Sequence, residues 1–138
     1  MESLKPSLDA QVAEFRRLCG YEGKIEVSDP YFPYKQGSEA FEYPYAKSPG
    51  CYIFATGDNT ILYIGKASRR LGDRIWAHIG RAGRPHEDGK FPYAAAWLKN
   101  AEPCARVYSI SVPDTHWWLA LALEGFLTER LLENKRRV

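Results

Sequence analysis

The 138-residue chain predicts one mixed α/β (α+β) domain, with a strand hairpin followed by helices and a further strand. Residues 51–55 and 60–64 are rich in β-branched and aromatic residues, and a polar, glycine-containing stretch joins them like a hairpin turn. Gly65 is expected to end the second strand. Residues 105–112 alternate between polar and apolar side chains and predict the next strand.

Helical periodicity predicts helices over residues 7–19, 71–79, 91–100 and from about 114 to Asn134. In the second of these segments three aliphatic side chains fall on one helical face, which predicts that this face packs on the sheet. The expected boundary residues are Ser7 as the first N-cap, Gly20 as the first stop, and Asp114 or Thr115 as the last N-cap.

Residues 1–47 are expected to form an N-terminal helix and arm, packed on a domain that spans residues 48–138. Residues 24–27 alternate like a short strand, whereas residues 29–49 combine four prolines with six aromatic residues. Proline at this density prevents long regular elements, and the aromatic content is too high for a disordered linker. The arm therefore either packs across the domain or contacts substrate, with its tyrosines stacked on unpaired bases.

Composition narrows the classes of protein that fit the chain. The net charge is only +2, so an argument for a nucleic-acid partner must rest on local charge. No run of eighteen apolar residues and no apolar N-terminal segment is present, which favours a cytoplasmic protein without a membrane span. The three cysteines are scattered and no Cys-x-x-Cys occurs, so reduced thiols are expected and structural zinc is not.

One acidic residue of the last predicted helix lies on an apolar face. A helical wheel of residues 117–131 places Glu124 among Trp117, Leu121, Leu127 and Leu131. A carboxylate on a core-facing stripe costs several kcal/mol unless it is paired or binds a metal. Glu124 is therefore interpreted either as half of a structural salt bridge or as a metal ligand.

Basic residues gather after the hairpin, where residues 66–90 hold seven lysines and arginines against three acidic residues. Such a local concentration is what binding to a phosphate backbone requires, although a solvated charged face has the same composition. The candidate nucleic-acid-binding residues are Arg69, Arg70, Arg81, Arg84 and Lys90.

The hairpin also carries a motif. Gly50-Cys51-Tyr52 followed by Tyr63-Ile64-Gly65 resembles the GIY-YIG nuclease signature, with the tyrosines eleven positions apart as in that family. The resemblance continues to an arginine on the next helix and a glutamate on the last, and covers about residues 48–134. It implies a small three-stranded, mostly antiparallel sheet flanked by helices. It also implies a divalent-metal-dependent endonuclease that hydrolyses phosphodiester bonds in DNA.

The resemblance assigns roles to particular side chains. Glu124 would be the single protein carboxylate on Mg²⁺ or Mn²⁺, an arrangement that suits an ion which keeps much of its hydration. Arg74 would neutralise the charge that develops on the phosphate. Tyr52 and Tyr63 would place hydroxyls in the site, Tyr52 nearest the attacking water.

Two further residues are catalytic candidates. An unperturbed tyrosine pKa of about 10 argues against tyrosine as an easy general base, unless a neighbouring cation or hydrated metal lowers it. Lys66 is placed to do this or to hold a phosphate, and several relatives carry a lysine at this position. His78, one helical turn after Arg74, is either a proton-transfer group or a hydrogen-bonded residue at the edge of the core.

The chain departs from the family pattern at three points. Cys51 replaces an aliphatic residue, Arg74 follows Tyr63 by eleven positions where many relatives have about one fewer, and Asn134 alone can stand for a late asparagine. Arg70 is therefore a rival to Arg74. These departures keep an alternative open, a catalytically silent or conditional nucleic-acid-binding module on the same fold.

The last predicted helix is apolar nearly all round. Trp117, Trp118 and Phe126 would form an interface if a second subunit covered them, and a homodimer through the C-terminal helix is therefore a further expectation.

Overall fold

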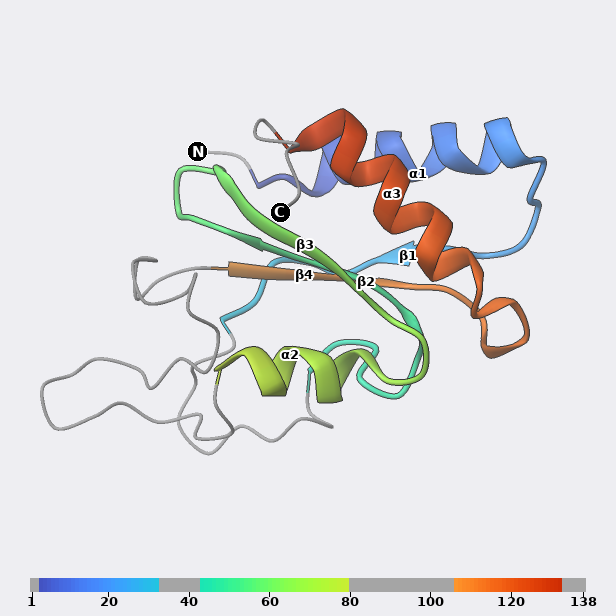
Figure 1. Ribbon diagram of the computed structural model, residues 1–138. Helices are drawn as coiled ribbons and strands as arrows, with labels where there is room; N and C mark the ends of the chain where they lie inside the picture. The colour runs from blue at the N-terminus through green and yellow to red at the C-terminus, as the bar shows by residue number, and fades with distance from the viewer. Residues whose placement is uncertain (1–2, 33–42, 80–105, 133–138) are drawn as a thin grey trace, which may run out of the picture.

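The computed structural model describes residues 3–32, 43–79 and 106–132 (Figure 1). In chain order the elements of these residues are α1 (Lys5–Cys19), β1 (Glu26–Val27), β2 (Gly50–Ala55), β3 (Ile61–Ala67), α2 (Leu71–Ile79), β4 (Arg106–Ser111), the short 3₁₀ helix η3 (Asp114–His116) and α3 (Leu119–Leu131). The mixed α/β class is therefore confirmed. The predicted helix over 91–100 lies outside the described residues.

The strands form one antiparallel sheet in the order β1-β4-β2-β3. The expected sheet of three strands is wrong by one, because the described residues contain four strands. The additional strand is β1, which lies in the segment whose alternation suggested a short strand and pairs with the end of β4 through Glu26 and Val27. The hairpin strands β2 and β3 are neighbours, and β3 is an edge strand of the described sheet.

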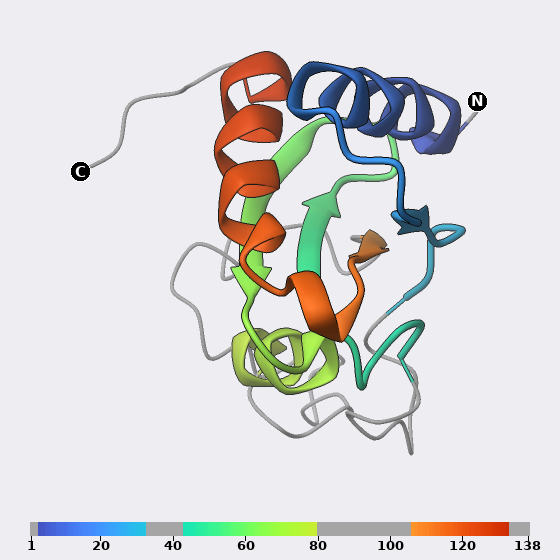
Figure 2. The same cartoon turned by 90° about the vertical axis from the view of Figure 1, so that its right-hand side faces the viewer.

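Helices cover both faces of the sheet (Figures 1 and 2). Side chains of α1 and α3 share one apolar core with Cys51 and Ile53 of β2, whereas α2 packs on the other face against Tyr52 and Phe54. Successive side chains of a strand point to opposite faces, so β2 supplies both cores and all of its residues are buried.

The motif glycines serve close packing rather than strand termination. Gly65 was expected to end the second strand, but β3 continues to Ala67 and pairs Gly65 with Tyr52. A Cβ at Gly65 would lie 2.4 Å from Cζ of Tyr52, so the absence of a side chain lets the ring lie over the strand. A Cβ at Gly50 would lie 1.8 Å from the carbonyl oxygen of Ile110 on β4. Both positions therefore require glycine.

Two predicted helix starts are wrong. Helix α1 begins at Lys5, without a side-chain cap and with Pro6 in its first turn, where the missing N–H of proline costs nothing. Gly20 ends it in the left-handed conformation, as predicted (φ 65°). The last helix is preceded by η3, so Asp114 begins a 3₁₀ turn and does not cap α3, which starts at Leu119.

The buried face of α3 is rotated relative to the predicted one. The residues buried against the sheet and α1 are Leu119, Ala120, Leu123, Leu127 and Thr128. Trp117 and Leu121, expected on the apolar face, are 52% and 61% exposed. Glu124 lies at the border of the buried face and is half-buried. The expectation that Glu124 is central to a core-facing stripe is therefore wrong.

Helix α1 is joined to α3 and to the rest of the fold by side-chain contacts. The rings of Phe15 and Phe126 lie 5.5 Å apart, and Nε of Arg130 donates to Oε1 of Gln11 at 2.8 Å. Phe126 therefore packs partly within the chain, and its place in an interface with a second subunit stays a prediction.

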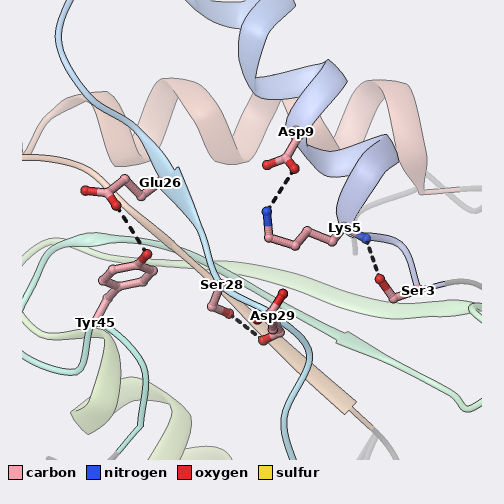
Figure 3. Close-up of polar contacts among 7 residues, drawn as sticks. All are labelled: Ser3, Lys5, Asp9, Glu26, Ser28, Asp29 and Tyr45. Carbon is pink, nitrogen blue, oxygen red and sulfur yellow. Dashed lines mark hydrogen bonds and ion pairs between the residues drawn. The ribbon is translucent and has the colours of Figure 1, made fainter.

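Polar contacts order the N-terminal segment along the sheet (Figure 3). The Tyr45 hydroxyl donates to Glu26 at 3.5 Å, and Oγ of Ser28 donates to the carbonyl oxygen of Asp29 at 2.9 Å. On α1, Nζ of Lys5 donates to Oδ2 of Asp9 at 2.9 Å. These contacts tie residues before β2 to one another and to the start of the sheet.

The described aromatic residues of the arm are largely packed against the domain. Tyr31 and Tyr43 stack with ring centroids 5.7 Å apart, and Tyr43 contacts Trp76 of α2. The Tyr31 hydroxyl lies 2.6 Å from Oγ of the buried Ser109. This arrangement favours the packed arm over tyrosines that stack on bases, because the Tyr31 and Tyr43 rings are already occupied.

Candidate active site

Three aromatic side chains of the predicted site meet on the α2 face of the sheet. The ring centroids of Tyr52 and Tyr63 are 6.1 Å apart, and His78 lies 5.4 Å from Tyr52 and 5.0 Å from Tyr63. The Tyr52 hydroxyl is 2.8 Å from Nε2 of His78, within hydrogen-bonding distance. The two strands and the helix therefore converge on one phenol oxygen.

Local structure explains this convergence. Tyr63 is the cross-strand partner of Phe54, two positions after Tyr52, so both tyrosines share a face of the antiparallel pair. Leu71 and Ile75 are fully buried and dock α2 on that face. His78 follows Ile75 by three positions and therefore points to the same side of the helix.

Arg74 completes the group from the exposed side of α2. Its positive charge and a side-chain hydrogen bond both act on the Tyr52 hydroxyl. Arg74 rather than its rival Arg70 is thus the arginine that meets this phenol, one helical turn before His78.

The two central groups have shifted pKa values. Burial, and then Tyr63, raise the pKa of Tyr52 above its ordinary value, although Arg74 opposes this shift. Arg74 thus lowers this pKa, as expected of a neighbouring cation, but burial outweighs its effect. Burial, followed by the charge of Arg74, lowers the pKa of His78 to about 4. At neutral pH the phenol is protonated and the imidazole is uncharged.

A basic surface pocket of about 480 Å³ opens beside this group, at the junction of β3 and α2. It is lined by four basic side chains and one carboxylate, together with small residues: Lys66, Ala67, Ser68, Arg69, Arg70, Asp73 and Arg74. Arg74 therefore belongs both to the pocket and to the surroundings of Tyr52. An anion in the pocket would lie next to the Tyr52 hydroxyl, attracted by a net positive lining. Arg81, Arg84, Lys90 and Asn134 lie outside the described residues.

Glu124 is not part of this group. Helix α3, which carries it, packs on the opposite face of the sheet from the Tyr52 side chain. The charge of Glu124 acts on the buried thiol of Cys51. Burial raises the pKa of that thiol, the negative charge of Glu124 raises it further, and the positive charge of Lys66 lowers it. Lys66 is also the cross-strand partner of Cys51. Glu124 therefore lies near the end of β3 that borders the basic pocket, across the edge strand from the tyrosines.

The arrangement of Glu124 fits one class of metal site. Within residues 3–32, 43–79 and 106–132, no three histidine, cysteine, aspartate or glutamate side chains lie close enough to form a metal-binding group. A half-buried single carboxylate fits Mg²⁺ or Mn²⁺ held mainly by water and substrate phosphate.

Sequence analysis missed Phe54, whose ring lies 5.7 Å from His78 and 6.0 Å from Tyr52. Its position two residues after Tyr52 on the same strand is a signal that could have identified it. The direct contact between Tyr52 and His78 had no such signal, because it depends on how α2 docks on the sheet.

In the described part of the chain, no helix has both the length and the apolar character needed to cross a membrane.

Comparison with protein-family models, with curated proteins and with solved structures finds no match.

Proposed function

We propose that the chain is a divalent-metal-dependent endonuclease that hydrolyses phosphodiester bonds in DNA, as the GIY-YIG resemblance implies. The observation that carries the proposal is the meeting of Tyr52, Tyr63, His78 and Arg74 at one hydroxyl, beside a basic pocket. Structural packing alone does not require a permanent cation next to a buried phenol and an uncharged histidine. Phosphodiester hydrolysis can use each of these groups, the cation to stabilise developing charge and the phenol and imidazole to transfer protons.

The basic pocket would hold the DNA backbone. Lys66, Arg69 and Arg70 line it and present positive charge without base readout, which suits phosphate contacts. Arg74 would contact the scissile phosphate, because it borders both the pocket and the Tyr52 hydroxyl. A guanidinium can donate to two phosphate oxygens at once and stabilise the charge that develops there.

His78 is the proposed proton acceptor. Its lowered pKa, about 4, leaves the imidazole uncharged at neutral pH, and its Nε2 faces the Tyr52 hydroxyl at 2.8 Å. The attacking water would pass a proton to the Tyr52 oxygen while the tyrosine proton moves to Nε2 of His78. Tyr52 remains a neutral phenol throughout, which agrees with its raised pKa. Tyr63 would fix the orientation of this hydroxyl.

Glu124 would hold Mg²⁺ or Mn²⁺ as the single protein ligand. Bound there, the ion would supply positive charge to the phosphate and make coordinated water more acidic.

The test is nicking of supercoiled plasmid with and without Mg²⁺ or Mn²⁺. Glu124→Gln and Arg74→Ala should each lower the rate by about 10²–10³-fold. Matched controls are Glu129→Gln, an exposed glutamate of the same helix, and Arg17→Ala, an exposed arginine of α1. Both controls should cleave like the unmodified chain. Cleavage that survives in both Glu124→Gln and Arg74→Ala would refute these roles.

A second candidate function is a catalytically silent or conditional nucleic-acid-binding module. It is favoured by the position of α3, which holds Glu124 on the opposite face of the sheet from Tyr52. This candidate predicts salt-dependent DNA binding that Arg69→Ala and Arg70→Ala weaken, without any product when metal is added. Metal-dependent turnover that Glu124→Gln abolishes would exclude it.

A further inference from the structure

The start of α3 exposes an apolar surface on the flank that carries Glu124. Trp117, Leu121 and Glu124 follow one another at i, i+4 and i+7, so they line one side of the helix. Trp117 has helical dihedrals although it precedes α3 (φ −56°, ψ −29°), so the helical rotation extends back to it. Trp117 is 52% and Leu121 61% exposed, so both offer apolar surface to a binding partner.

This flank begins at the same end of the sheet as the basic pocket. The carbonyl oxygen of Trp117 accepts a hydrogen bond from the backbone N–H of Ala120 at 3.1 Å. The carbonyl oxygen of Ala120 in turn accepts from the thiol of Cys51 at 3.2 Å, and Cys51 pairs with Lys66, which lines the pocket. Figure 1 shows the end of β3 and the starts of α2 and α3 at the same end of the sheet.

We propose that Trp117 stacks on an unpaired base of the substrate. The inference rests on the proposed function and names its substrate class, DNA with unpaired nucleotides next to the scissile phosphate. A ligand whose phosphates occupy the basic pocket presents bases to the neighbouring surface, and an indole is a good stacking partner for a base. Charge complementarity thus selects a nucleic acid over an apolar partner.

The bases must be unpaired because the faces of bases within a duplex are covered by their neighbours. Along α3, the rise of about 1.5 Å per residue places Trp117 about 10 Å from Glu124. This length corresponds to about three stacked nucleotide steps of one strand. The base held by Trp117 is therefore a few nucleotides from the phosphate that is cut, within a flap, gap, fork or single strand.

Trp118 provides a matched control. It is exposed to the same extent as Trp117, 52% in each case. Its ring packs on His116 at 5.0 Å, and His116 packs on Tyr21 at 5.2 Å. At about 100° per residue its Cα–Cβ direction differs from that of the Glu124 flank, and its ring meets the edge of the Trp117 ring with centroids 6.2 Å apart.

The first experiment measures binding without metal, so that it does not depend on turnover. A fluorescent single-stranded oligonucleotide and a blunt duplex of the same sequence are titrated with each chain. Trp117→Ala should weaken single-strand binding by about 5- to 150-fold and leave duplex binding unchanged. Trp117→Phe should retain most of the affinity, and Trp118→Ala should have a much smaller effect. Unchanged single-strand affinity in Trp117→Ala would overturn the inference, as would an equal loss for Trp118→Ala.

The second experiment measures Mg²⁺-dependent cleavage of a gapped and an intact duplex. The unmodified chain should prefer the gapped duplex, and Trp117→Ala should lose this preference. If plasmid nicking requires Glu124 and Arg74 but Trp117→Ala keeps its preference, the stacking role fails and the nuclease stands. If no chain cleaves but Trp117→Ala loses single-strand binding, the nuclease fails and the stacking role stands.

If Trp117→Ala converts a sedimenting dimer to monomer without changing DNA affinity, a second copy covers the flank and the inference is overturned.

Discussion

Replacement of Gly65 by alanine should displace the Tyr52 ring and uncouple it from His78. The new Cβ would lie 2.4 Å from Cζ and 2.5 Å from the hydroxyl oxygen of Tyr52. Unstrained carbon atoms approach to about 3.5 Å, so the ring must move by about 1 Å. It is fully buried and packed against Phe54, Tyr63 and His78, so it has little space to move into.

The displacement has two measurable consequences. Overpacking of this kind costs about 1–3 kcal/mol of unfolding free energy, measured by urea denaturation. A shift of about 1 Å also breaks the 2.8 Å contact between Tyr52 and His78, and such a misplacement lowers a catalysed rate by about 10²-fold. Plasmid nicking measures the second effect.

Gly125→Ala is the matched control, because a Cβ at that exposed helical position meets nothing within 4 Å. It should stabilise the chain by up to about 1 kcal/mol. In a Tyr52→Ala background, Gly65→Ala should cost little, since the clashing ring is absent. Equal stability of Gly65→Ala and the unmodified chain would refute the clash with Tyr52, as would an equal cost of Gly65→Ala in both backgrounds.

The remaining predictions concern pH, a buried hydroxyl and thiol reactivity. The pKa of His78 is about 4 in the fold and about 6.5 when unfolded, so the unfolded chain binds the proton better. The free energy of unfolding should therefore fall as pH drops from about 6.5 to about 4. The urea midpoint of His78→Gln should depend less steeply on pH over this range than that of the unmodified chain. Equal slopes for the two chains would contradict the lowered pKa of His78. Tyr31→Phe should cost about 1–2 kcal/mol in urea denaturation, because it removes the 2.6 Å contact with the buried Ser109 hydroxyl, and Ser109→Ala should reduce that cost. A thiol-labelling reagent should modify the exposed Cys19 rapidly, as measured by peptide mass spectrometry. Cys51 is buried, and burial raises the pKa of its thiol, so it should be labelled only on unfolding. Rapid labelling of Cys51 in the folded chain would refute its burial.

Local patterns in the chain predicted the strands and the helix that carry the candidate site, and the GIY-YIG resemblance selected the residues on them. The β-branched and aromatic runs placed Tyr52 and Tyr63 on paired strands, and helical periodicity placed Arg74 and His78 one turn apart on the next helix. These are short-range preferences of the backbone and side chains, which depend little on the rest of the fold. The meeting of the four side chains depends in addition on how α2 docks.

Glu124 shows where such reasoning stops. A helical wheel finds an apolar sector of the last helix, but this helix is apolar on most sides, so its wheel does not determine which sector is buried. Packing of Phe126 on Phe15 and the contact of Ala120 with Cys51 orient the helix. Trp117 is thereby left exposed, and Glu124 lies at the border of the core.

The sequence by itself determined the α/β class, the hairpin and the last residue of α1, because periodicity and turn chemistry act over a few residues. The residues of the Tyr52 group were selected by the GIY-YIG resemblance. Tertiary structure decided the extension of β3 through Gly65, the opposite shifts of the Tyr52 and His78 pKa values, and the placement of Glu124 across the sheet. Each of these depends on contacts between segments far apart in the chain. Burial and the close approach of a ring arise only when those segments pack together.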